Sequence, residues 1–192
     1  MKLWVARHAQ PLVAAGVCYG ALDVAADVQA TQAAAEKLAA ALPLGIAVTS
    51  SPLQRCEQLA QSLRSLRPDL TPIFDTRLRE MDFGQWEGQR WDAIGHSALE
   101  AWTADFAWHR PGGGESVQLF MQRVAAAWDA AGTQPRLWIT HAGVARACSL
   151  LAVGMRDIQQ ANQWPHAAPG YGEWFIFEAG VPVQTPPVQP GC

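Results

Sequence analysis

The sequence lacks any apolar run long enough to cross a lipid bilayer. It also lacks the charged region, apolar region and cleavage site of a signal peptide, because polar residues appear by position 7. The formal net charge is only −3, and neither acidic nor basic residues form a block. We therefore expect a cytoplasmic protein that binds neither nucleic acid nor a membrane surface.

Cysteine is scarce, and its positions do not match the usual metal-binding patterns. The four cysteines are widely separated along the chain and fit no zinc spacing. In a reducing compartment we expect them to be free thiols. The sequence therefore predicts neither a metal site nor a cofactor. The cysteines are Cys18, Cys56, Cys148 and Cys192.

The pattern of apolar residues predicts alternating strands and helices. With 192 residues, 49% of them hydrophobic, the chain has room for one domain with a sizeable core, and no internal repeat or linker divides it. Predicted strands lie at residues 2–6, 45–51, 71–78, 136–140 and 173–178. Predicted helices lie at residues 28–42, 51–66, 97–109, 116–131 and 143–154, the second of them with Ser51 as its N-cap and Pro52 in its first turn.

Strands that alternate with helices are typical of an α/β fold. We expect a three-layer sandwich with a mainly parallel central sheet flanked by helices. The predicted domain covers residues 1–180. Residues 181–192 are rich in proline and are predicted to form an irregular tail.

Reactive side chains follow several of the predicted strands at the point where each strand ends. Arg7 and His8 follow the first strand, Arg55 lies one turn into the helix after the second, Glu80 follows the third, and His141 follows the fourth. In parallel sheets the carboxyl ends of the strands meet at one edge, where ligands bind. We therefore expect these five side chains to lie close together.

This set of side chains suits the hydrolysis of a phosphate monoester. The planar guanidinium of arginine matches pairs of phosphate oxygens and offsets the charge of the dianion. A neutral imidazole can attack phosphorus if one ring nitrogen is unprotonated, and a second histidine can donate to the phosphoryl oxygens. A carboxyl group can protonate the departing oxygen and, once ionised, activate water.

Five segments together resemble the histidine phosphatase superfamily, which includes cofactor-independent phosphatases and phosphoglycerate mutases. They follow the family's order and span roughly residues 2–178. The segments are "ARHAQP" for the family's Arg-His-Gly signature, "SSPLQRCEQLA" for its Ser-x-Leu-x-Arg segment, "LREMDFGQWEG" for its acid loop, "PGGGES" for the turn before the long helix, and "ITHAGVAR" for its second histidine.

The resemblance implies a phosphoglycerate mutase-like fold and a metal-independent phosphomonoesterase. It implies a phosphohistidine intermediate on His8. Arg7, Arg55 and His141 would hold the phosphoryl group, and Glu80 would be the proton donor, with Asp82 as a rival for that role. The implied partner is a small phosphate monoester.

Position 9 departs from the family signature, because Ala stands where the family usually has Gly. If the site needed a positive φ at this position, Ala would cost about 1 kcal/mol or more. If the site needs only the backbone carbonyl for the His8 ring, Ala supplies it equally well. We favour the second interpretation.

The loop "GVCYGALDV", residues 16–24, resembles the Cys-Tyr-Gly-x-x-Asp loop of bacterial α-ribazole phosphatases. These enzymes remove the 5′-phosphate of α-ribazole phosphate during assembly of the nucleotide loop of cobalamin. The resemblance implies substrate contacts from Cys18, Tyr19 and Gly20. The mutases of the superfamily carry longer insertions, for which this chain is too short.

Several alternatives stay open at this stage. The substrate could instead be a sugar phosphate or a phosphoprotein, the enzyme could be a phosphatase of broad specificity, or the chain could be a non-catalytic phosphate-binding module. Residues 97–114, with Trp102, Phe106 and Trp108, could form a lid over an aromatic ligand. We interpret Arg123 as structural and Glu87 as a structural residue or one at the rim of the site. A homodimer is compatible with the sequence, which does not decide the oligomeric state.

Overall fold

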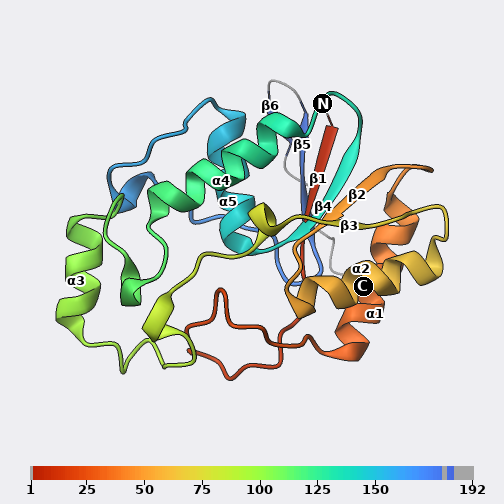
Figure 1. Cartoon of the computed structure of the whole chain (residues 1–192). Helices are drawn as coiled ribbons and strands as arrows, with labels where there is room; N and C mark the ends of the chain where they lie inside the picture. Colours follow the sequence, from red (N-terminus) through yellow and green to blue (C-terminus); the bar gives the residue numbers. More distant parts are fainter. Residues whose placement is uncertain (1, 179–180, 184–192) are drawn as a thin grey trace, which may run out of the picture.

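A six-stranded sheet forms the centre of the computed structural model, which describes residues 2–178 and 181–183 (Figure 1). The strand order is β3-β2-β4-β1-β5-β6. The first four strands in this order pair in parallel, whereas β5 pairs antiparallel with both β1 and β6. The strands are β1 Lys2–Arg7, β2 Ala47–Ser50, β3 Ile73–Phe74, β4 Arg136–Thr140, β5 Trp174–Glu178 and β6 Val181–Val183.

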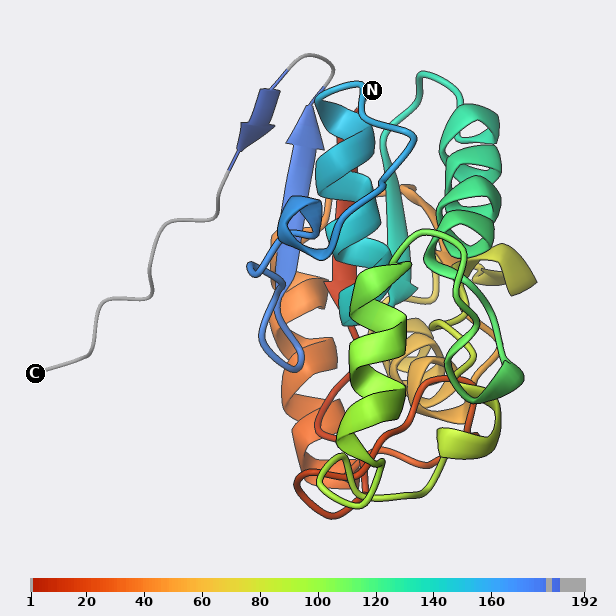
Figure 2. The ribbon, with the colours of Figure 1, turned by 90° about the vertical axis from the view of Figure 1, so that its left-hand side faces the viewer.

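Helices cover both faces of this sheet, as a three-layer sandwich requires (Figure 1). Helices α1 and α2 pack on one face, and α4 and α5 on the other. Figure 2 shows α3 in front of the sheet, close to the loop of residues 10–26. The helices are α1 Val28–Ala41, α2 Gln54–Leu66, α3 His96–Ala104, α4 Val117–Ala130 and α5 Ala142–Ala152, with short 3₁₀ turns at Thr76–Leu78, Gly84–Trp86, Pro111–Gly113 and Ala161–Gln163.

Alternation along the central strands produces the two cores between these layers. In β1, Leu3 and Val5 are buried against the α4 and α5 side, whereas Trp4 and Ala6 are buried against the α1 and α2 side. Successive side chains of a strand point to opposite faces, so a strand buried on both sides is apolar throughout. This explains why "LWVA" and "LWI" have no polar residue.

Side chains cap the starts of α1 and α4, whereas α2, α3 and α5 begin without a side-chain cap. The Asp27 side chain accepts from the Ala30 N–H at the start of α1, and the Ser116 side chain accepts from the Leu119 N–H at the start of α4. The prediction that Ser51 caps α2 is wrong, because α2 begins at Gln54. Ser51 instead extends β2, since its N–H donates to the Ile139 carbonyl.

Other boundaries also differ from the predicted ones. The third strand is only Ile73–Phe74, because the Asp75 carboxylate accepts from the Arg77 N–H and starts a 3₁₀ turn. The helix predicted at residues 97–109 ends at Ala104. Val181–Val183 forms strand β6, which pairs with β5, so the prediction of an irregular tail is wrong for these residues. The rest of that tail, residues 184–192, lies outside the described residues.

Within residues 2–178 and 181–183, no helix is both long enough and apolar enough to cross a membrane.

Candidate active site

The imidazole of His8 is held in one tautomer at the carboxyl end of β1. Its Nδ1 lies 2.7 Å from the carbonyl oxygen of Ala9. A carbonyl can only accept, so Nδ1 carries the proton and Nε2 keeps a lone pair. Burial is the main cause that lowers the pKa of His8 to about 3; the charges of Arg55 and Arg7 add to this, and the Ala9 hydrogen bond opposes it. His8 therefore presents an unprotonated nitrogen near neutral pH.

The backbone at Ala9 needs no glycine. No non-glycine residue within the described ranges has a positive φ, so Ala9 adopts an ordinary conformation. Its methyl group is buried in the core beside α1 and α2. The structure therefore favours the interpretation that position 9 supplies a carbonyl oxygen to His8.

Arg55 lies directly against His8 and is completely buried. Its Nε lies 3.3 Å from His8 Nε2 and donates to that lone pair. Its Nη1 and Nη2 donate to the carbonyl oxygens of Leu22 and Gly20, at 2.8 and 2.6 Å. The guanidinium thus joins the loop of residues 16–24 to the imidazole.

His141 is also completely buried, at the N-terminus of α5. The centroid of its ring lies 5.2 Å from that of His8. Its Nε2 lies 2.9 Å from the hydroxyl of Ser51 and 3.5 Å from the sulfur of Cys56. Burial, with the positive charge of Arg55 next in importance, lowers the pKa of His141 well below its usual value.

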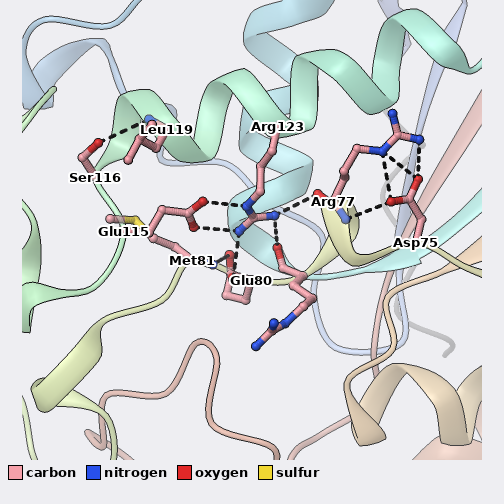
Figure 3. A network of polar contacts seen from close by, with 9 residues as sticks. Asp75, Arg77, Glu80, Met81, Glu115, Ser116, Leu119 and Arg123 are labelled. Carbon is pink, nitrogen blue, oxygen red and sulfur yellow. Dashed lines mark hydrogen bonds and ion pairs between the residues drawn. The ribbon is translucent and has the colours of Figure 1, made fainter.

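The carboxylate of Glu80 is held by two backbone N–H groups. Oε1 accepts from Met81 at 3.1 Å, and Oε2 accepts from Gly143 at 3.0 Å. A Cβ at Gly143 would lie 2.2 Å from Glu80 Oε1, so only glycine allows this approach. Arg123 donates to the carbonyl of Glu80 and pairs with Glu115 (Figure 3). These contacts agree with a structural role for Arg123.

Arg7 is held by a loop near the C-terminal end of the chain. Its Nη1 donates to the Pro169 carbonyl at 3.2 Å, and its guanidinium carbon lies 3.8 Å from the centroid of the Tyr171 ring. The hydroxyl oxygens of Tyr171 and Tyr19 lie 2.8 Å apart. The two tyrosines therefore connect the 16–24 loop to the 165–173 loop beside Arg7.

A cavity of about 290 Å³ opens beside these groups. Arg7, His8, Tyr19 and Glu80 line it, together with Arg146. Most of the remaining wall is aromatic or aliphatic. These apolar side chains are Met81, Phe83, Trp91, Trp102, Phe106, Val117, Phe120 and Trp164.

Two of the three substrate contacts predicted in the 16–24 loop do not line this cavity, and the buried Arg55 and His141 are also absent from its lining. Cys18 is completely buried in a separate cluster with Trp86 and Ile94, because the 16–24 loop folds inward against the 84–95 segment. Gly20 packs so tightly that an added Cβ would lie 1.9 Å from the Met81 carbonyl oxygen. Gly20 takes part in the site only through its carbonyl oxygen, which accepts a hydrogen bond from Arg55.

The segment predicted as a lid contributes only part of its aromatic residues. Trp102 and Phe106 line the cavity and stack on each other, with centroids 5.7 Å apart. Trp108 is 55% exposed and lies away from the cavity lining.

Comparison with known proteins identifies the family. The family model of the histidine phosphatase superfamily (branch 1) matches residues 3–178, which is nearly the whole described chain. The chain belongs to the histidine phosphatase superfamily. The family expected from the five sequence segments is thereby confirmed, and so is the phosphoglycerate mutase-like fold.

Named relatives of this histidine phosphatase include both a phosphatase and a mutase. It is 34% identical to a glucosyl-3-phosphoglycerate phosphatase of Mycolicibacterium vanbaalenii, over 85% of this chain and 77% of the relative. The structure of a mycobacterial glucosyl-3-phosphoglycerate phosphatase in complex with VO3 aligns with a TM-score of 0.74 at 27% identity, covering 91% of this chain and 90% of that one. The structure of a phosphoglycerate mutase from Thermus thermophilus aligns with a TM-score of 0.69 at 29% identity, covering 92% of each chain. Family membership and the named phosphatase support phosphatase activity and do not specify which ester is hydrolysed.

The structure of this histidine phosphatase also adds residues that the sequence did not single out for the site. Ser51 contacts His141, Tyr171 stacks on Arg7, and Arg146 lines the cavity. Arg146 had an available signal, since it lies five residues after His141 on a helix that begins at the site. Among the described residues, no group of three or more His, Cys, Asp or Glu side chains is arranged to hold a metal ion.

Proposed function

We propose that this histidine phosphatase hydrolyses phosphate monoesters through a phosphohistidine on His8. The observation that carries this proposal is the hydrogen bond from Nδ1 to the Ala9 carbonyl, which leaves Nε2 unprotonated. In the first step, the phosphoryl group displaces the Arg55 Nε–H group from the lone pair of Nε2, Nε2 attacks phosphorus, and the bond between phosphorus and the ester oxygen breaks. The protonated carboxyl of Glu80 gives its proton to that oxygen, so the alcohol leaves neutral.

The second step reverses the role of Glu80. The Glu80 carboxylate takes a proton from water, and the hydroxide attacks phosphorus while the bond to His8 Nε2 breaks. Inorganic phosphate leaves and both side chains return to their starting states. Arg7 and Arg55 offset the negative charge on the phosphoryl oxygens. The neutral imidazole of His141 donates a hydrogen bond from Nδ1 to one of the phosphoryl oxygens, because its Nε2 faces the Ser51 hydroxyl.

The substrate that we propose is α-ribazole 5′-phosphate, in the assembly of the nucleotide loop of cobalamin. The compound joins a dimethylbenzimidazole ring to a ribose phosphate. The aromatic wall of the cavity, which includes Phe83, Trp102 and Phe106, suits a ring of this kind. The sequence of the 16–24 loop supports the same substrate, and Tyr19 of that loop lines the cavity.

Glucosyl-3-phosphoglycerate is the second candidate substrate, and the 34% identical relative is the observation that favours it. Its leaving group is a hydroxylated sugar acid, which needs many polar contacts. The cavity offers a largely apolar wall beyond Arg7, Glu80 and Arg146, so it suits the benzimidazole ring better. Another sugar phosphate would face the same difficulty.

Two measurements test this proposal. The first compares kcat/KM for α-ribazole 5′-phosphate, glucosyl-3-phosphoglycerate, 3-phosphoglycerate and 4-nitrophenyl phosphate, with a metal chelator present. We expect α-ribazole 5′-phosphate to lead by at least about 100-fold. A lead of that size for glucosyl-3-phosphoglycerate would replace the proposed substrate, and loss of all activity in chelator would contradict the metal-independent mechanism.

The second measurement traps the intermediate. Substrate carrying a labelled phosphate is mixed with enzyme, and the reaction is quenched in alkali, where phosphohistidine survives. We expect label on the wild type and on a His96→Ala control, whose histidine is exposed, and none on His8→Asn. Absence of label on the active wild type under single-turnover conditions would contradict the covalent step. A chain that binds phosphate without any turnover would instead be the non-catalytic module.

A further inference from the structure

The cavity wall contains nitrogen donors that no protein acceptor reaches. Among the described residues, four buried side-chain nitrogen atoms have no hydrogen-bond partner. They are the Nε atoms of Arg7, Arg136 and Arg146 and the indole Nε1 of Trp102. The residues Arg7, Trp102 and Arg146 line the cavity, whereas Arg136 does not. Buried donors are nearly always paired in folded proteins, so a cluster of unpaired ones at a cavity points to acceptors supplied by a ligand.

The proposed reaction explains only the first of these donors. Arg7 lies beside His8, where the phosphoryl oxygens would be. Arg146 and Trp102 come from α5 and α3, respectively, and line the cavity together with the aromatic side chains. A leaving group seated in this cavity would lie against both residues.

Arg146 is a cation without a carboxylate partner. Its Nη2 donates to the His166 carbonyl at 3.3 Å, its Nε has no acceptor, and no ion pair of the described residues includes it. Burial is the main cause that lowers the pKa of Arg146; the charge of Glu80 opposes the shift and that of Arg7 adds to it. An electron-rich acceptor at this guanidinium would replace part of the lost hydration.

Trp102 is held rigidly by its neighbours. Its ring stacks on Phe106 at 5.7 Å and meets Phe83 and Trp86 edge to face, with centroids 5.9 Å apart in each case. The indole Nε1 can only donate. The ring therefore provides an aromatic wall, and its single N–H group is fixed, buried and without a protein acceptor.

We propose that Arg146 and Trp102 select the leaving group of the substrate. The leaving group that we propose is a nucleoside, which combines an aromatic ring system with hydrogen-bond acceptors, namely its sugar oxygens and ring nitrogens. This inference rests on the proposed phosphatase function and extends it, because it assigns the acceptor contacts to two residues. It holds for any nucleoside 5′-phosphate and not only for α-ribazole 5′-phosphate.

The test is a specificity ratio, defined as kcat/KM for a nucleoside 5′-phosphate divided by kcat/KM for 1-naphthyl phosphate. 1-Naphthyl phosphate has an aromatic leaving group without acceptors beyond the ester oxygen. The nucleotides are α-ribazole 5′-phosphate, adenosine 5′-phosphate and uridine 5′-phosphate. We expect Arg146→Met and Trp102→Phe each to lower the ratio about 10-fold for the best nucleotide. Trp102→Phe keeps an aromatic ring and removes the N–H group.

Three variants serve as comparisons. Arg64→Met removes an exposed arginine, and Trp128→Phe removes an indole that packs on Phe177; neither residue lines the cavity, and neither change should alter the ratio. Arg146→Lys keeps a charged donor and should restore part of the ratio. This rescue separates recognition from a purely structural effect of the arginine.

The outcomes distinguish this inference from the proposed function. If both Arg146→Met and Trp102→Phe leave the ratio unchanged, the inference is overturned although the enzyme remains a phosphatase. It is also overturned if the wild type prefers 1-naphthyl phosphate to every nucleotide tested. If α-ribazole 5′-phosphate is not hydrolysed but another nucleotide is, with the same dependence on both residues, the inference stands and the proposed substrate fails. Should Arg146→Met not fold, Trp102→Phe decides.

Discussion

Glu87 and Arg55 hold the same short loop from two sides. The Glu87 carboxylate accepts from the backbone N–H groups of Gly20, Ala21 and Leu22, at 2.8 to 3.1 Å. Arg55 donates to the carbonyl oxygens of Gly20 and Leu22 and also contacts His8. The carboxylate thus positions the loop, the loop positions the guanidinium, and the guanidinium lies against the imidazole.

Replacing Glu87 by Gln should therefore weaken both folding and catalysis. The neutral amide has a single acceptor oxygen, and its NH₂ group faces backbone donors, so some N–H groups lose their partner. We expect the free energy of unfolding to fall by about 2 kcal/mol and kcat/KM by about 10-fold, measured by urea denaturation and by steady-state kinetics. Glu36→Gln, at an exposed position of α1, is the matched control. Equal effects of the two changes would refute this role for Glu87.

Ala9→Gly should have little effect on activity. The backbone at Ala9 already has an ordinary φ, and the carbonyl that holds His8 is present with either residue. We expect kcat/KM to change less than about 3-fold, and the free energy of unfolding to fall by about 1 kcal/mol because a buried methyl group is lost and glycine is more flexible. A large gain in kcat/KM would show that Ala9 strains the site.

The residues at the strand ends could be predicted from the sequence for a physical reason. β1, β2 and β4 are parallel, so whatever follows each of them must meet at one edge of the sheet. Two hydrogen bonds align these ends, from the His8 N–H to the Thr140 carbonyl and from the Ser51 N–H to the Ile139 carbonyl. The apolar pattern of the strands and their parallel pairing were therefore sufficient to predict that His8 and His141 lie close together.

The contacts made by long loops could not be predicted in this way. Tyr19 and Tyr171 are 152 positions apart, and nothing in the pattern of either loop indicates their hydrogen bond. Cys18 was expected in the site because its loop resembles the Cys-Tyr-Gly-x-x-Asp loop of α-ribazole phosphatases, but adjacent residues of an irregular loop can face opposite sides. The predicted cap at Ser51 failed for a related reason, since strand pairing outweighed the capping signal.

The two tyrosines provide a test of how Arg7 is held. Tyr19→Phe and Tyr171→Phe each remove the same hydrogen bond, so we expect the double variant to change KM no more than either single variant. Tyr171→Leu also removes the ring that packs 3.8 Å from the Arg7 guanidinium. We expect it to raise KM about 5-fold more than Tyr171→Phe does. Additive effects of the two Phe changes would show that the hydroxyl groups act independently.

Acid should destabilise the protein through its buried histidines. The pKa of His8 is lowered from 6.5 to about 3, and that of His141 is also well below 6.5, so the unfolded chain binds more protons than the folded one in this range. Stability therefore rises with pH, and it is lost as the pH falls from about 6.5 toward 3. Each such histidine contributes a slope of up to about 1.4 kcal/mol per pH unit.

Urea denaturation between pH 6.5 and 4.5, in phosphate-free buffer, measures this slope. His8→Asn should reduce it by up to about 1.4 kcal/mol per pH unit, because one titrating group is gone. His96→Ala, which removes an exposed histidine, should leave it unchanged. An unaltered slope in His8→Asn would mean that His8 is protonated in the folded protein.

Glu80→Gln should reveal the proton donor through the leaving group. A sugar or nucleoside alcohol is a poor leaving group and needs a proton as the ester bond breaks, whereas 4-nitrophenolate leaves without one. We expect Glu80→Gln to lower kcat for an alkyl ester by about 100-fold or more and to lower the rate of phosphohistidine formation from 4-nitrophenyl phosphate much less. The single-turnover burst of 4-nitrophenolate measures that rate, before any water attack.

Asp82→Asn is the control for this experiment, since Asp82 is the neighbouring carboxylate and was a rival for the same role. Asp82 is exposed, and its Oδ1 accepts from the Gly84 N–H at 2.8 Å. Glu80, by contrast, is held by Met81 and Gly143 at the cavity. If Asp82→Asn showed the leaving-group dependence and Glu80→Gln did not, the proton would come from Asp82, and the loop between them would have to rearrange when substrate binds.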